Sequence, residues 1–171
     1  MFNKKFFACV LVSLVLAFCC FILSSEAKKD EKPYKVAVIE TEKGTMRAVL
    51  YEKYAPVTTD NFINLVQNEF YKDMTFHRVV EDFVIQTGDP TGTGSGGSEK
   101  TIPLEKHRKL KHKSAGILAM ARKRHPDSAS SQFYITLKKQ PALDGHYAVF
   151  GKVYEGLETI YDIKQGDKLM S

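Results

Sequence analysis

The first patterned part of the chain alternates between apolar and polar positions. Within residues 36–50 apolar side chains recur at every second position on both sides of a polar turn at residues 41–44, which ends in Gly44. A period of two is typical of a β-strand that buries one face, and a short glycine-containing turn joins two such strands. The pattern therefore predicts a β-hairpin at the start of the folded region.

The pattern then changes to a helical period. Pro56 stands where the first turn of a helix tolerates proline. The apolar positions that follow it recur at helical spacing and are Phe62, Leu65, Val66 and Phe70. An amphipathic helix over residues 56–69 is predicted, with its apolar stripe packed on the core.

Short apolar runs continue through the rest of the chain. Strand-like runs occupy residues 75–80, 83–87, 116–121, 132–137 and 147–153. Polar turns and a glycine-rich loop at residues 88–97 separate them, and residues 157–163 favour a short second helix. Many short strands with turn signals and two helices predict a mainly β domain, a closed antiparallel barrel whose ends the helices cap.

The beginning of the chain carries a different pattern. Two lysines precede an apolar run at residues 6–23, and the small residues Ser25 and Ala27 follow it. These parts predict a signal peptide cut after Ala27, a linker at residues 28–33 and one domain at residues 34–171. An uncleaved membrane anchor is the open alternative, because the run is long enough to span a bilayer. Either way we expect an exported domain, which is periplasmic, secreted or anchored at a membrane.

Composition narrows the chemistry further. The chain has 171 residues, a net charge of +5 and three cysteines, all within residues 6–23. The rest of the chain therefore offers no thiol for catalysis or metal binding. The histidines lack zinc-site spacing, and the glycines of residues 92–97 lack the lysine that ends a phosphate-binding loop. We expect no cofactor, no metal and no nucleic-acid partner.

The most basic segment spans residues 105–113. It has no interleaved aromatic residues, so a solvated surface loop is the first interpretation. Docking on an anionic cell envelope or another polyanion is the second.

One arginine stands on a strand among apolar residues. In strict alternation Arg78 shares a face with Phe76 and Val80. A guanidinium in this setting either extends from the rim of the sheet into water or takes part in function. The pattern alone leaves both interpretations open.

Several motifs occur together in an order that one known family shares. They are Phe76-His-Arg-Val79, Phe83-Val-Ile-Gln-Thr-Gly-Asp89, Gly94-Ser-Gly-Gly97, Gly116-Ile-Leu-Ala-Met-Ala121, Ser131-Gln-Phe-Tyr134 and Leu143-Asp-Gly-His-Tyr-Ala-Val-Phe-Gly151. The chain resembles the cyclophilins, and its short loops resemble their compact bacterial branch. The resemblance implies an eight-stranded antiparallel barrel capped by two helices, peptidyl-prolyl cis-trans isomerase activity and no cofactor.

The resemblance also implies a site. Arg78 takes the catalytic role, in which its guanidinium donates a hydrogen bond to the twisted amide. The remaining implied residues form a proline pocket and a peptide groove: Phe83, Val84, Tyr134 and Leu143 in the pocket, Gln86 and Gln132 as hydrogen-bonding groups, and Gly94, Ala121, Arg122 and Tyr147 along the groove. Phe76, Ile85 and Phe133 are expected in the barrel core.

Three features depart from the family pattern. Ala142 stands where many members have tryptophan, which predicts weak cyclosporin binding. The segment at residues 122–130 is one residue longer than in the better-known form. After Asp167 the family usually continues through a closing strand, so we expect a shortened last strand that leaves a sheet edge open.

The expected partners are proline-containing peptides and unfolded exported proteins, bound by a monomer. Contact with a membrane is expected only if the apolar run at residues 6–23 stays uncleaved. A proline-peptide-binding chaperone module with little catalysis is the alternative function, which Ala142 and the short last strand favour.

Overall fold

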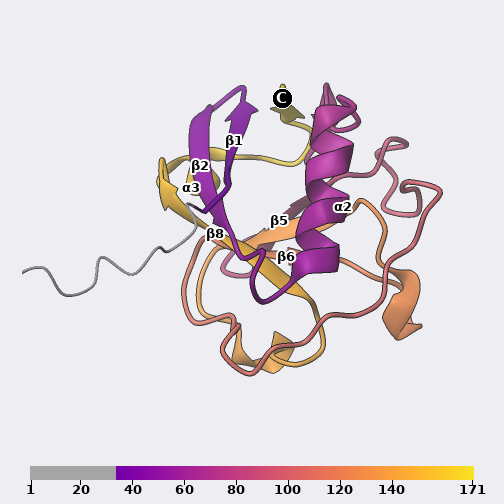
Figure 1. The fold of residues 1–171 in the computed structure, drawn as a ribbon. Coiled ribbons are helices and arrows are strands. Elements are labelled where there is room, and N and C mark those ends of the chain that lie inside the picture. Colours follow the sequence, from indigo (N-terminus) through magenta and orange to yellow (C-terminus); the bar gives the residue numbers. More distant parts are fainter. Residues whose placement is uncertain (1–33) are drawn as a thin grey trace, which may run out of the picture. The chain divides into compact units, whose positions relative to one another are not determined.

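The computed structural model describes residues 34–171 (Figure 1). The predicted signal peptide, its uncleaved alternative, the linker and all three cysteines lie outside the described residues. Within residues 34–171 no helix has the length and apolar content needed to cross a bilayer.

The strands of the described domain form one antiparallel sheet of nine strands, in the order β3-β9-β1-β2-β8-β6-β7-β5-β4. In chain order they are β1 (Val36–Thr41), β2 (Gly44–Leu50), β3 (Met74–Thr75), β4 (Arg78–Val80), β5 (Val84–Thr87), β6 (Ile117–Met120), β7 (Phe133–Thr136), β8 (Val149–Glu155) and β9 (Lys168–Leu169). The helices are α2 (Pro56–Gln67) and α3 (Thr159–Asp162), with single 3-10 turns at η1 (Pro126–Ser128) and η2 (Pro141–Leu143).

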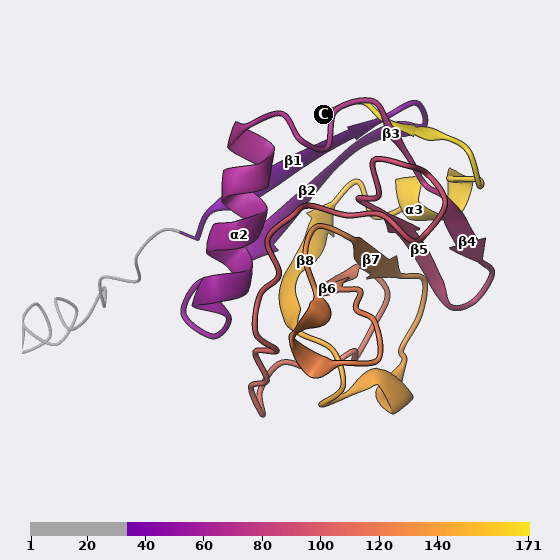
Figure 2. The same ribbon diagram turned by 90° about the vertical axis from the view of Figure 1, so that its right-hand side faces the viewer.

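The two ends of the sheet are joined by the chain itself. The end strands β3 and β4 are consecutive, separated only by Phe76 and His77, so the sheet curls round (Figure 2). Within the described domain no hydrogen-bonded ladder joins β3 to β4. The short β9 pairs with Thr41 of β1 and with Met74 and Thr75 of β3. The mainly β antiparallel fold with two helices is confirmed, and the barrel is not fully closed, which agrees with the expected short last strand. The sheet has nine strands and not the expected eight. The run at residues 75–80, predicted as one strand, is divided into β3 and β4, because its two halves pair with different strands, β9 and β5.

The first two strands form the predicted hairpin. Thr41 faces Gly44 across a two-residue loop. The Thr41 hydroxyl accepts a hydrogen bond from the Lys43 N–H at 3.1 Å and donates one to the Gly44 carbonyl at 2.8 Å. Gly44 has a φ of +139°, which a residue with a side chain rarely adopts. The turn thereby sets the register between β1 and β2.

The helix α2 begins at Pro56 as predicted, but it ends at Gln67, earlier than the predicted end at residue 69. Glu69 has a positive φ of 54°, and its N–H bonds to the Val66 carbonyl. A left-handed residue ends a helix in this way, and the apolar pattern does not reveal such a backbone turn.

A distant residue holds the start of α2. The Glu105 carboxylate accepts hydrogen bonds from the N–H groups of Val57 at 3.1 Å and Thr58 at 2.6 Å, and from the Thr58 hydroxyl at 2.7 Å. The local cap residue, Ala55, makes no side-chain hydrogen bond. Glu105 therefore satisfies free N–H groups and places negative charge at the positive end of the helix.

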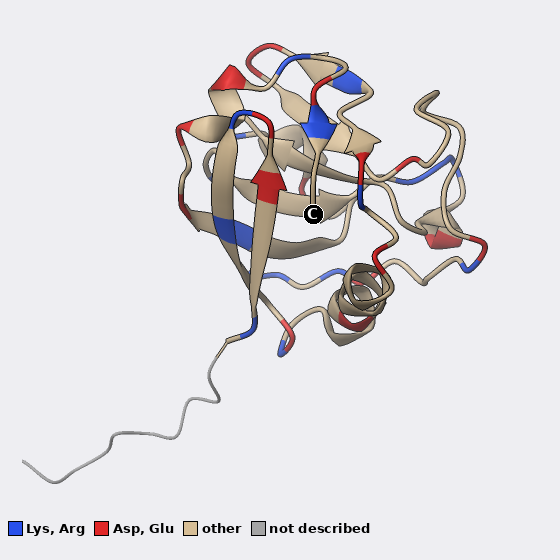
Figure 3. Cartoon of the chain, turned by 90° about the horizontal axis from the view of Figure 1, so that it is seen from above, with Lys and Arg blue, Asp and Glu red and all other residues tan. Residues whose placement is uncertain are grey.

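The basic segment at residues 105–113 is held in place by the Glu105 hydrogen bonds and by packing on the loop that precedes α2. His107 lies on the Tyr54 ring with centroids 4.7 Å apart, and the Lys109 ammonium lies 5.6 Å from the same ring. Seen from above in Figure 3, acidic and basic residues are interspersed along the chain.

Strand alternation divides the apolar residues of the sheet into two clusters. On β7, Phe133 belongs to the main core and Tyr134 to a second cluster on the opposite face. On β5, Ile85 and Val84 are divided in the same way. Both faces of these strands are therefore buried, although each cluster has different partners.

The main core is aromatic at its centre. Phe62 of α2 packs against Phe133 and Phe150, with ring centroids 5.4 Å and 5.1 Å apart. Phe76, Ile85 and Phe133 are each exposed by no more than 1%. The prediction that these three residues belong to the core is confirmed.

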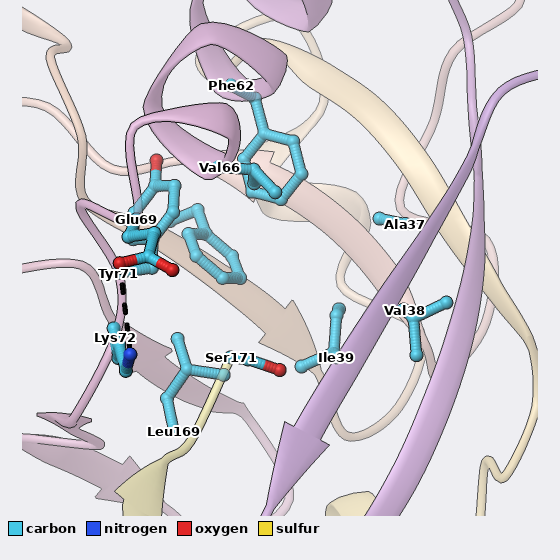
Figure 4. A pocket seen from close by; sticks show the side chains of 11 residues that line it. Ala37, Val38, Ile39, Phe62, Val66, Glu69, Tyr71, Lys72, Leu169 and Ser171 are labelled. Atoms are coloured by element: carbon cyan, nitrogen blue, oxygen red, sulfur yellow. Dashed lines mark ion pairs between the residues drawn. The ribbon is translucent and has the colours of Figure 1, made fainter.

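An apolar hollow of about 240 Å³ opens onto this core (Figure 4). Phe62 and Val66 of α2 lie on one side of it, and Ile39 of β1 and Leu169 of β9 lie on the other. Beside it, β9 pairs with β1 at Thr41, and the two residues after β9 also form backbone hydrogen bonds with Glu40. None of the predicted site residues lines it.

The cap on α2 yields a test of the fold. Replacing Glu105 by alanine leaves the first N–H groups of the helix without their acceptor, so we expect the free energy of unfolding to fall by about 1 kcal/mol. Urea unfolding followed by circular dichroism measures this. Lys106→Ala is the matched control in the same exposed segment, and an equal loss in both variants would contradict the capping role.

Candidate active site

The second apolar cluster gathers most of the predicted pocket residues. It contains Val84 of β5 and Tyr134 of β7, which are buried, together with Ile117, Ala119 and Val149. Partly buried around it are Tyr51, Phe83, Leu110, Ala121, Leu143 and Tyr147. Residues that lie far apart in the sequence thus meet on the outer face of the sheet.

Arg78 lies at the border of this cluster. It is exposed on β4, directly opposite Gln86 of β5. Its guanidinium carbon lies 5.5 Å from the centre of the Phe83 ring, and Nη1 makes a long contact of 3.5 Å with Gln86 Oε1. Among residues 34–171 it forms no ion pair. The guanidinium therefore has N–H groups available to a ligand placed on the cluster.

A chain of amides continues from Arg78 to the glycine-rich loop. Gln86 Nε2 donates a hydrogen bond to Gln132 Oε1 at 2.8 Å. Gln132 Nε2 donates to the carbonyl oxygens of Gly94 at 3.0 Å and Gly96 at 2.7 Å. The two glutamines thereby fix each other's orientation and tie the loop to the sheet.

A buried carboxylate organises the glycine-rich loop. Asp89 is only 1% exposed and accepts hydrogen bonds from the Thr91 hydroxyl and from the N–H groups of Thr91, Gly94 and Gly96. Burial alone would raise the pKa of Asp89, but these hydrogen bonds prevail and lower it to about 2. A Cβ atom at Gly96 would collide with the same carboxylate, so the loop needs glycine there.

Sequence reasoning did not predict a site role for Asp89, which it placed only in the glycine-rich loop and in one of the family motifs. The available signal was an aspartate two residues before a threonine in a glycine-rich stretch, which is typical of a side chain that folds the backbone around itself.

Arg122 lies beside the cluster, and its Nε and Nη1 groups donate hydrogen bonds to backbone carbonyls. Its Nε donates to the His146 carbonyl at 2.9 Å, and Nη1 donates to the carbonyls of Lys123 at 3.0 Å and Arg124 at 3.2 Å. The guanidinium also lies 5.1 Å from the centre of the Tyr147 ring. Arg122 therefore connects two segments that border the predicted groove.

A polar hollow of about 100 Å³ adjoins the cluster. Its lining includes the predicted groove and hydrogen-bonding residues, and consists of Gln86, Gly94, Gly96, Ala121, Arg122, Lys123, Ser128, Ser130 and Gln132. Ala121 belongs both to the apolar cluster and to the lining of the polar hollow. The two regions are therefore neighbours, and an apolar surface lies beside a polar one.

The wall formed by η2 lacks a large side chain at one position. Leu143 is half-buried in the cluster, whereas the neighbouring Ala142 is exposed.

No group of His, Cys, Asp and Glu side chains suited to a metal ion occurs within residues 34–171.

Comparison with known proteins was made on the sequence and on the fold. The family model for cyclophilin-type peptidyl-prolyl cis-trans isomerases matches residues 36–170. Peptidyl-prolyl cis-trans isomerase CYP18-2 of Arabidopsis thaliana is 42% identical over 137 residues, covering 78% of this chain and 82% of that protein. Peptidyl-prolyl cis-trans isomerase ppi1 of Schizosaccharomyces pombe is 46% identical over 124 residues, covering 71% of this chain and 79% of that protein. These relatives are eukaryotic, so the resemblance to the compact bacterial branch stays a prediction.

Solved structures agree with the sequence comparison. A cyclophilin-type isomerase of Cryptosporidium parvum superposes with a TM-score of 0.75 at 34% identity, covering 81% of this chain and 92% of that one. A second crystal structure of that protein, determined in the presence of the dipeptide Ala-Pro, gives a TM-score of 0.74 over 79% and 92% of the two chains. Sequence, fold and family model agree, and the chain belongs to the cyclophilin-type peptidyl-prolyl cis-trans isomerases.

Proposed function

We propose that the chain isomerises X–Pro bonds at the outer-face cluster, with Arg78 as the catalytic residue. The observation that carries this proposal is an exposed guanidinium at the border of an apolar cluster, for which residues 34–171 provide no ion-pair partner. The Cryptosporidium structure with Ala-Pro supports a proline-containing ligand for this fold.

The chemistry requires rotation about an amide and no proton transfer. Amide resonance opposes the rotation with a barrier of about 18–20 kcal/mol. A hydrogen bond from Arg78 to the twisted amide is stronger in the transition state than in the planar ground state, because twisting localises the nitrogen lone pair. A guanidinium stays charged at any working pH, so it supplies this donor without titrating.

The apolar cluster supplies the place for the proline ring. The partly buried Phe83 lies next to the Arg78 guanidinium. Leu143, which is also partly buried, belongs to the same cluster, and the buried Val84 and Tyr134 form its base. A ring bound there excludes water that would otherwise compete for the guanidinium, which strengthens its hydrogen bond to the amide.

The polar hollow accommodates the peptide beside the proline. Gln86 and Gln132 orient Arg78 and offer amide groups to the substrate backbone, while Gly94 and Ala121 leave room for it. Arg122 and Tyr147 complete the groove by packing on each other.

The cellular setting belongs to the same proposal. The lysines, apolar run and small residues at residues 4–27 support export through a signal peptide. The clients are then unfolded exported proteins whose folding waits for proline isomerisation, which takes tens to hundreds of seconds without a catalyst.

Replacing Arg78 by alanine tests the mechanism. We expect the catalytic rate to fall by about a hundredfold or more, because the donor to the twisted amide is lost. Exchange spectroscopy by NMR on an Ala-Pro peptide measures interconversion without a protease. Arg47→Ala, an exposed arginine on β2, is the matched control.

Unchanged exchange in Arg78→Ala would refute the catalytic role. Peptide binding by the unaltered chain without accelerated exchange would instead favour the chaperone module.

Asp89→Asn tests the glycine loop. Because the pKa of Asp89 is lowered from 3.8 to about 2, its ionised form stabilises the fold by about 2 kcal/mol. This stabilisation is complete above about pH 5 and is lost progressively as the pH falls to about 1. The amide that replaces the carboxylate cannot accept all four hydrogen bonds, so we expect lower stability at neutral pH and a flatter decline in acid, measured by urea unfolding at several pH values. Parallel declines for both proteins would contradict this account.

Export is tested on the chain's own first residues. Expressed with residues 1–33 intact in a secreting host, the chain is expected outside the cytoplasm with Lys28 as its first residue, as determined by mass spectrometry. A membrane-bound product that keeps residues 6–23 would support the anchor, and a cytoplasmic product would refute export.

A further inference from the structure

One buried histidine lies behind the proline pocket and has no part in the mechanism above. His112 is 0% exposed, yet both of its ring nitrogens have partners. Nε2 lies 2.9 Å from the Tyr134 hydroxyl, and Nδ1 lies 3.0 Å from Asp144 Oδ1. The same carboxylate oxygen accepts a hydrogen bond from the His112 N–H at 2.8 Å. The imidazole thus bridges β7 and the residue that follows η2.

The partners decide which nitrogen carries the proton. An ionised carboxylate can only accept hydrogen bonds, so Nδ1 donates to Asp144. Nε2 of the neutral ring is then an acceptor, and the Tyr134 hydroxyl donates to it. The hydroxyl hydrogen is therefore directed into the protein and away from the pocket.

The surrounding charges favour this neutral arrangement. Burial lowers the pKa of His112 and outweighs the opposing effect of Asp144, while Lys111, whose ammonium lies 3.9 Å from Asp144, also lowers it. Burial raises the pKa of Tyr134, with Tyr147, Asp144 and Arg122 as the other groups that act on it. The hydrogen bonds from His112 lower the pKa of Asp144 against the effect of burial.

We propose that His112 is a positioning residue of the proline pocket, which holds the Tyr134 hydroxyl inside the protein so that the ring presents only carbon to the substrate. The inference rests on the proposed pocket role of Tyr134. The ring is held from two sides: it stacks on His112 at 16°, and it meets Tyr147 edge-on at 84°. Through Asp144, His112 also holds the turn that carries Leu143, so one imidazole sets two walls of the pocket.

Loss of the acceptor has a defined consequence for binding. Without Nε2, the Tyr134 hydroxyl loses its acceptor, and because the side chain is only 5% exposed it reaches water only through a shift of the ring towards the solvent side of the cluster. A proline ring that enters the pocket removes this water and leaves a buried hydroxyl unpaired, which is costly. The cost falls on peptide binding more than on rotation of the bound amide.

A double-mutant cycle tests the proposal. The variants are His112→Phe, Tyr134→Phe and the double variant, each verified as folded by circular dichroism. The dissociation constant of an Ala-Pro tetrapeptide and the exchange rate at saturation are measured by NMR. His112→Phe is expected to raise the dissociation constant about tenfold with little change in the saturated rate, the order expected for one buried unpaired group. In the Tyr134→Phe background the same substitution is expected to cost clearly less affinity, because only the contact through Asp144 to the turn that carries Leu143 is then left to lose.

A pH series tests the same idea without altering His112. Protonation makes Nε2 a donor, so the Tyr134 hydroxyl loses its acceptor. Because burial lowers the pKa of His112, affinity is expected to fall only as the pH drops below about 6.5, the ordinary imidazole value. In Tyr134→Phe affinity should stay constant over this range. His77, whose pKa burial also lowers, is unchanged in both proteins and so serves as an internal control.

The outcomes separate this inference from the proposed function. Equal losses from His112→Phe in both backgrounds, or the same pH dependence with and without the hydroxyl, would overturn the positioning role. A chain that binds the peptide but does not accelerate its exchange would refute the proposed catalysis. The dissociation constants of the double-mutant cycle would still test the role of His112 in that case.

Discussion

The alternation of side chains along β5 and β7 is the constraint on which the rest of the site depends. Ile85 and Phe133 are buried in the main core, while Val84 and Tyr134 point the opposite way into the outer cluster. The pocket is therefore built on strands whose other face is packed, which holds its side chains more firmly than a loop could. A register slip of one residue would exchange the two sets.

Hydrogen-bond networks orient the polar groups that border the outer cluster. Gln86 and Gln132 connect Arg78 to the glycine-rich loop, and the carboxylate of Asp89 fixes that loop from inside. Groups near the site whose pKa values are shifted, such as Asp89 and His112, act as hydrogen-bond partners within the protein. This agrees with a reaction that needs orientation and a permanent donor, and no acid or base poised near neutral pH.

Much of the fold follows from local pattern. The hairpin around Gly44, the start of α2 at Pro56 and the core positions Phe76, Ile85 and Phe133 were all predictable, because they express turn chemistry, proline geometry and strand period. The end of α2 was not, since a left-handed backbone at Glu69 leaves no trace in hydrophobic periodicity. The sequence motifs also indicated the site residues through the family resemblance, and the structure brings them into one region.

What the sequence determined by itself was the list of elements and the residue types available for chemistry, because propensity, period and turn signals act over a few neighbouring residues. Only the tertiary structure decided which distant groups meet: Glu105 at the start of α2, Gln132 at the glycine-rich loop, and His112 between Tyr134 and Asp144. These contacts depend on how the sheet curls. Hydrogen bonds are directional and short, so a partner in another segment becomes visible only once both segments have been placed in space.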